Sequence, residues 1–122
     1  MPLDEAVPCP PLSNRAGRAG TMCWSVAHGG PEDVVVTLSG ELDLVAAADV
    51  SSLLKDAVST AKDVTVELEA LTFIDSSGLG ALLGAHSAAQ DQERVLRLRR
   101  PQAAVARILH VTQLDEVFTI DP

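Results

Sequence analysis

The chain has 122 residues, a formal net charge of −8 and an aromatic content of only 2%. This length predicts a single domain, and a hydrophobic fraction of 47% is enough for a core built almost wholly from aliphatic side chains. The acidic balance argues against binding to nucleic acid, because neutralising phosphates needs a basic surface.

Residues 1–20 contain several prolines and glycines and show no apolar periodicity. We therefore expect a disordered N-terminal tail over residues 1–20 and one folded domain over residues 21–122. The acidic start does not resemble a secretory signal, and no run is apolar enough for a membrane span. Cys9 and Cys23 match no metal or redox spacing. A reducing cytoplasm, away from the membrane, is the simplest expected location.

Two strands are predicted over residues 21–27 and 34–39, and the turn signals between them favour a hairpin. Gly40 is expected to end the second strand. A helix from about residue 46 to residue 60 follows, because apolar residues recur there at helical spacing. The residues of that apolar face are Val50, Leu53, Leu54, Ala57 and Val58.

The second half of the chain alternates strands and helices. A third strand over residues 64–68 precedes a helix over residues 77–90, and a fourth strand lies near Leu96 and Leu98. Pro101 suits the first turn of a third helix, and residues 117–120 form the last strand. The order β-β-α-β-α-β-α-β predicts an α/β fold with a mixed sheet and helices mainly on one face.

Two short motifs follow the second and third predicted strands. The first is Gly40-Glu41-Leu42-Asp43, and the second is Asp75-Ser76-Ser77-Gly78. Taken alone, the second motif is typical of a helix N-cap. Taken together, over about residues 21–120, the motifs and their placement resemble the STAS family of anti-sigma factor antagonists.

The resemblance implies a STAS fold and a protein switch. It implies that Ser76 is phosphorylated by a partner serine kinase, which is itself the anti-sigma factor. The unphosphorylated protein would bind that factor and release the sigma factor, and a PP2C-type phosphatase would reset the switch. The residues expected at the partner surface are Glu41, Asp43, Asp75, Ser77 and Gly78. We expect no catalytic residue, metal or cofactor. The ATP would belong to the partner, since this chain has no phosphate-binding loop of its own.

Departures from the family pattern concern the helix ends. Ala46 and Ala48 stand where the family commonly has a capping Thr and then a Pro, so the first helix lacks that Thr cap. This makes a capping role for Asp43 an alternative to a partner contact. Gln113 stands where Gly is common at the end of the third helix, and a left-handed residue there would cost about 1 kcal/mol.

Other interpretations stay open. A STAS sensor or scaffold without a phosphorylation cycle is the main alternative, whereas a serine hydrolase would need Gly-x-Ser-x-Gly around Ser76. His86 lies about 15 Å from Ser76 along the same helix. This distance excludes direct proton transfer between the two side chains and favours a histidine packed in the core. Gly80 and Gly84 belong to a small-residue face that either packs on a helix or admits a partner. We expect the arginines late in the chain to form a solvated face: Arg94, Arg97, Arg99, Arg100 and Arg107.

Overall fold

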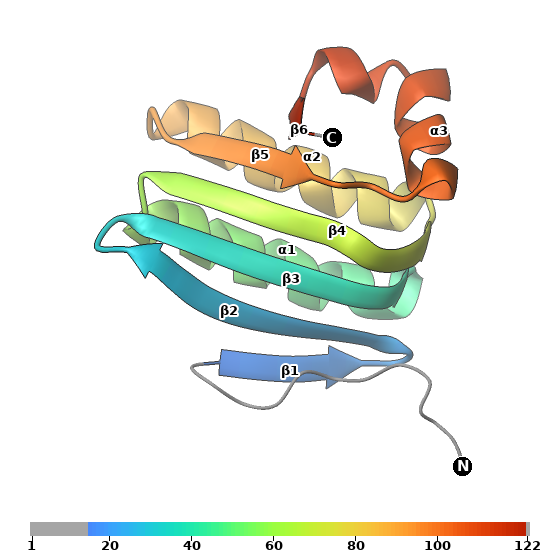
Figure 1. Cartoon of the computed structure of the whole chain (residues 1–122), viewed down its shortest axis with the longest axis horizontal. Coiled ribbons are helices and arrows are strands. Elements are labelled where there is room, and N and C mark those ends of the chain that lie inside the picture. Colours follow the sequence, from blue (N-terminus) through green and yellow to red (C-terminus); the bar gives the residue numbers. More distant parts are fainter. Residues whose placement is uncertain (1–14, 122) are drawn as a thin grey trace.

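A six-stranded mixed sheet, in the order β1-β2-β3-β4-β5-β6, carries the fold in the computed structural model, which describes residues 15–121 (Figure 1). The strands are β1 Arg15–Ala19, β2 Met22–Gly30, β3 Asp33–Leu42, β4 Asp63–Ile74, β5 Val95–Arg99 and β6 Thr119–Asp121. The first three strands pair antiparallel, and β3 to β6 pair parallel. Parallel neighbours need crossover connections, and helices supply them here.

Three helices and one short 3₁₀ turn connect the parallel strands. They are α1 Leu44–Thr60, α2 Ser76–Asp91, α3 Ala103–Val111 and η1 Leu114–Glu116. Helices α1 and α2 lie side by side behind the same face of the sheet in Figure 1. This confirms the predicted α/β class, the mixed sheet and the order of elements from residue 21 onward. None of the helices within residues 15–121 is long and apolar enough to cross a bilayer.

The core lies between the sheet and this helix pair, and it is aliphatic. Alternate residues of the central strands point into it and are fully or almost fully buried, namely Val34, Val36, Leu38, Val64, Val66, Leu68, Leu96 and Leu98. The predicted apolar face of α1 is also buried there. Because side chains alternate across a strand, the opposite sheet face carries the polar residues.

Part of the predicted tail forms a strand. Its residues 1–14, with Cys9, lie outside the described residues, but Arg15–Ala19 form β1. This strand pairs antiparallel with β2, so that Gly17 lies opposite Trp24. Main-chain pairing needs no apolar alternation, and the sequence pattern therefore gave no sign of this strand.

Several boundaries also differ from the prediction. Gly40 does not end β3: it has a φ of 95°, lies at a register shift, and the strand continues to Leu42. A Cβ at Gly40 would overlap the Thr21 carbonyl oxygen, so glycine allows this bulge. Pro101 lies before α3 and not in its first turn, because Gln102 is the N-cap. Gln113 adopts the left-handed backbone conformation, with a φ of 62°, which is the conformation considered for this position at the end of the third helix.

Candidate functional site

The two sequence motifs meet at the carboxyl ends of β3 and β4. Leu42 and Ile74 are the last register pair of these parallel strands, and the Asp75 amide donates to the Leu42 carbonyl oxygen at 3.2 Å. Asp43 and Asp75 therefore follow neighbouring strands directly, and each precedes a helix. The topology thus brings together residues that are about thirty positions apart in the chain.

Both aspartates cap the helices that follow them. The Asp43 carboxylate accepts hydrogen bonds from the Val45 amide at 3.1 Å and from the Ala46 amide at 3.4 Å. The Asp75 carboxylate accepts from the Gly78 amide at 3.0 Å. The capping role considered for Asp43 is therefore present: α1 starts at Leu44, two residues earlier than expected, and Asp43 caps it in place of the missing Thr.

Ser76 is the first residue of α2, and its side chain is exposed. Its hydroxyl has no hydrogen-bond partner among the described residues. Ser77 is half-buried in the same turn. The fold thus presents the Ser76 hydroxyl to solvent and places it directly after a capping carboxylate, Asp75.

Gly78 has a packing role. An ideal Cβ there would lie 2.7 Å from Leu42 Cγ, 2.8 Å from Ile74 Cγ1 and 2.8 Å from the Leu42 carbonyl oxygen. Glycine therefore lets the first turn of α2 approach the ends of β3 and β4 closely. Gly78 is buried, so packing alone accounts for a glycine here, and the partner contact expected at this position stays a prediction.

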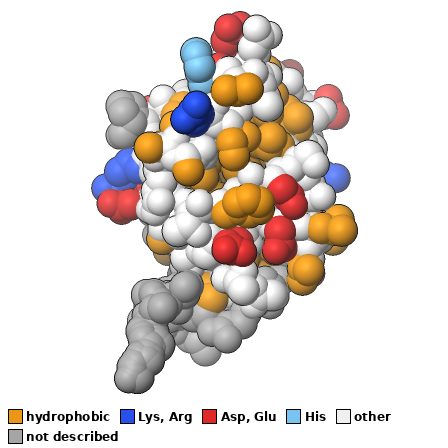
Figure 2. Space-filling model, turned by 90° about the vertical axis from the view of Figure 1, so that its right-hand side faces the viewer, with side chains coloured by type: hydrophobic (Ala, Val, Ile, Leu, Met, Phe, Trp, Pro, Cys, Tyr) orange, Lys and Arg blue, Asp and Glu red, His pale blue; other side chains and the backbone are white. Residues whose placement is uncertain are grey.

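The acidic side chains of the site are not neutralised by neighbours. Glu41 is exposed and lies in register with Phe73 of β4, while Asp43 and Asp75 are half-exposed. Within residues 15–121, none of these three carboxylates forms an ion pair. Figure 2 looks onto this end of the sheet and shows acidic side chains lying among apolar ones.

Sequence reasoning missed three apolar residues here. Leu44, Val45 and Phe73 are 74%, 66% and 44% exposed, and we call them the apolar patch. Leu44 and Val45 directly follow Asp43, and Phe73 precedes Asp75 by two positions. The sequence did carry one signal of exposed apolar residues: the Leu-Val pair directly after Asp43 does not belong to the apolar face predicted for the first helix.

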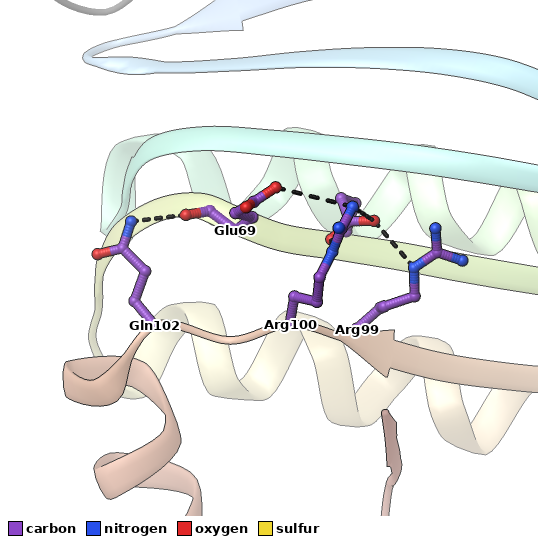
Figure 3. A network of polar contacts seen from close by, with 5 residues as sticks. Glu69, Arg99, Arg100 and Gln102 are labelled. Carbon is purple, nitrogen blue, oxygen red and sulfur yellow. Dashed lines mark hydrogen bonds and ion pairs between the residues drawn. The ribbon is translucent and has the colours of Figure 1, made fainter. Parts of the chain in front are cut away.

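The late arginines are less free than a solvated face implies. Glu67 is buried on the sheet face away from α1 and α2, and it binds Arg99 Nε at 3.1 Å and Arg100 Nε at 3.0 Å (Figure 3). Arg100 also lies 3.7 Å from Glu69. The hydrogen bond from Arg100 lowers the pKa of Glu67 despite its burial. A shallow cavity of about 340 Å³ lies beside this network and is lined by side chains of both signs.

The small-residue face of α2 was expected either to pack on a helix or to admit a partner, and its two glycines differ in this respect. At Gly84 a Cβ would lie 3.6 Å from Lys55 Cε of α1, whereas at Gly80 nothing lies within 4 Å. Packing between helices accounts for Gly84 but not for Gly80. His86 packs edge-on against Phe118, with ring centroids 5.2 Å apart, which confirms the expected packed histidine.

Comparison with known proteins agrees with the fold. The family model described as "STAS domain" matches residues 26–122. The chain is similar to an anti-sigma-B factor antagonist of Bacillus subtilis (strain 168), with 25% identity over 88 residues, covering 72% of this chain and 81% of that one.

Two solved structures share the fold. An anti-sigma factor antagonist from Mycobacterium paratuberculosis superposes with a TM-score of 0.74 at 25% identity, covering 83% of this chain and 86% of that one. The Bacillus cell fate determinant SpoIIAA in its phosphorylated form superposes with a TM-score of 0.65 at 23% identity, covering 81% and 91%.

Proposed function

The chain belongs to the STAS domain family, and from that membership we propose that it is an anti-sigma factor antagonist switched at Ser76. In its unmodified form it binds an anti-sigma factor and so releases the sigma factor. Phosphorylation of Ser76 ends that binding. The observation that supports this most strongly is the exposed Ser76 hydroxyl, free of hydrogen bonds within the described chain, between unpaired carboxylates.

The site tolerates a phosphate without unfolding. A phosphate adds a charge of about −1.5 to −2 at pH 7, and the first turn of a helix offers free amides and a favourable dipole to an anion. Ser76 occupies the first position of α2, so its phosphate would lie at that helix end. We therefore expect the modified protein to keep its fold and to change only its surface.

The same phosphate opposes binding. Glu41, Asp43 and Asp75 lie at the same end of β3 and β4 as Ser76 and form no ion pair within the described chain, so the added charge enlarges an acidic region. A partner fitted to a neutral hydroxyl would have to bury this charge without a counterion, and an unpaired buried charge is costly. Contact with the partner ends while the fold persists.

The phosphoryl group comes from the partner's ATP. The anti-sigma factor acts as a serine kinase: the Ser76 oxygen takes the γ-phosphoryl group, ADP leaves, and the hydroxyl proton passes to the kinase or to water. A PP2C-type phosphatase hydrolyses the phosphoester and restores the hydroxyl. This cycle needs ATP, which fits a cytoplasmic location.

Calorimetric titration with candidate anti-sigma factors tests the proposal. Wild type and Ser76→Ala should bind equally in the absence of ATP, because the substitution removes the acceptor oxygen and little volume. With ATP and Mg²⁺, wild type should lose binding and Ser76→Ala should keep it, while Ser77→Ala serves as the matched control and behaves as wild type. Stable binding of wild type that ATP never alters would favour a STAS scaffold instead.

A further inference from the structure

The apolar patch contributes little to the packing of the fold, although Val45 lies close to Gly20 at the turn between β1 and β2. Leu44 and Val45 occupy the first two positions of α1, where acidic or small polar side chains suit the helix dipole and its free amides better than aliphatic ones. Both side chains are more than half exposed, and so they contribute little to the core. Exposed large apolar side chains gathered at one place mark a surface that another molecule covers.

The patch lies at the same end of the sheet as the switch serine. Asp43 and Asp75 follow the register pair Leu42 and Ile74, which places Leu44 and Ser76 one residue further along each neighbouring segment. Three of the six exposed large hydrophobic residues in the described chain belong to this patch. Apolar and acidic side chains therefore lie at the same end of the sheet as Ser76, and Figure 2 shows side chains of both kinds on this face.

From this arrangement we infer that the apolar patch supplies most of the affinity for the anti-sigma factor, which docks on it through an apolar centre bordered by Lys or Arg side chains. The inference rests on the proposed function. Apolar anchors at the centre of an interface carry most of the binding free energy, whereas charges at its rim mainly govern association rate and specificity. The unpaired carboxylates of Glu41, Asp43 and Asp75 match such a basic border.

A second copy of this chain fits the patch poorly. Two copies meeting through this end would bring their unpaired carboxylates together, and like charges facing each other across an interface oppose association. The net charge of −8 adds to this repulsion. A partner with basic residues around an apolar centre meets neither obstacle.

Docking on an apolar surface also explains why one phosphate is enough to end binding. Covering Leu44, Val45 and Phe73 removes water from around Ser76, and a phosphate enclosed under the apolar centre, away from the basic border, loses its hydration without gaining a counterion. Salt screens repulsion between exposed charges but not this loss of hydration. The ratio between the dissociation constants of the phosphorylated and unmodified proteins should therefore change little as salt is raised.

Surface plasmon resonance with the immobilised anti-sigma factor distinguishes the contribution of the apolar patch from that of the carboxylates. Leu44→Ser and, independently, Phe73→Ser should speed dissociation about tenfold or more, as expected for central apolar contacts. Glu41→Gln should mainly slow association and reduce its dependence on salt. Val95→Ser is the matched control, since Val95 is 41% exposed but begins β5 at the opposite end of the sheet, and its rates should equal those of wild type.

Thermal melts of each variant confirm that the fold is kept. If Leu44→Ser and Phe73→Ser both dissociate at the wild-type rate while phosphorylation still ends binding, the inference is overturned and the proposed function stands. If wild type binds no anti-sigma factor at all, the proposed function itself fails. Sedimentation should show a monomer, and a dimer that Leu44→Ser dissolves would instead identify a second copy as the occupant.

Discussion

Gly78 and Gly80 lie two residues apart in α2, but their surroundings predict opposite effects of the same substitution. Replacing Gly80 by Ala adds a Cβ that meets nothing within 4 Å. Alanine is favoured over glycine inside a helix by about 0.8–1 kcal/mol. We therefore expect Gly80→Ala to stabilise the protein by about this amount, which raises Tm by about 3–5 °C for a domain of this size.

Gly78→Ala gains at most the same helix propensity, but its Cβ would lie 2.7–2.8 Å from two core carbons and from the Leu42 carbonyl oxygen. The carbonyl belongs to β3 and cannot rotate away as a flexible side chain could. Overpacking of this kind costs about 1–3 kcal/mol, which leaves a net loss of up to about 2 kcal/mol after the gain in helix propensity. The two variants should then differ by about 1–3 kcal/mol, which is the cost of overpacking itself.

Urea unfolding followed by circular dichroism measures both values on matched preparations. The expected result is a higher midpoint for Gly80→Ala and a lower midpoint for Gly78→Ala, with the same dependence on urea concentration as wild type. Equal stabilisation by both substitutions would refute the close approach of α2 to β3 at Gly78, on which the position of Ser76 depends.

Three further predictions follow from the contacts of single side chains. Asp43→Ala should lower the unfolding free energy by about 0.5–2 kcal/mol through loss of the cap, whereas Asp43→Asn should keep the melt and weaken only partner binding; equal melts for both would contradict the capping role. Glu67 has a folded-state pKa below its usual value of 4.5, chiefly through the hydrogen bond from Arg100, so its contribution is present at neutral pH and is lost as pH falls below that value. Glu67→Gln should therefore cost about 1–2 kcal/mol at pH 7, where both arginines are half-exposed, and should reduce the loss of stability that wild type shows in acid melts. Gln113→Gly should raise Tm, because Gln113 has a φ of 62°; an unchanged or lower Tm would show that the unfolded-state entropy of glycine offsets the gain.

The sequence allowed prediction of those parts of the fold that periodicity encodes. Alternation at Val64, Val66 and Leu68 gave the central strand, and it correctly placed helices α1 and α2 on one face of the sheet. It could not predict β1, because the residues Arg15–Ala19 show no apolar alternation. The sequence prediction also ended β3 at Gly40, whereas the strand continues to Leu42. A glycine that ends a strand cannot be distinguished in a sequence from one that permits a bulge.

The candidate site was predicted in part for a similar reason. Asp75 and Ser76 follow a strand and begin a helix, and this placement is readable from pattern alone. The buried packing role of Gly78 and the exposure of Leu44 and Phe73 depend on which surfaces other elements cover. Such coverage is a property of the tertiary fold, and a single sequence does not encode it in any local pattern.

Tandem mass spectrometry of the protein after incubation with an anti-sigma factor kinase, ATP and Mg²⁺ tests the central claim most directly. The account predicts a single added phosphate on Ser76 and none when the substrate is Ser76→Ala, while Ser77→Ala is modified as well as wild type. A phosphate on Ser77, or undiminished phosphorylation of Ser76→Ala, would contradict it.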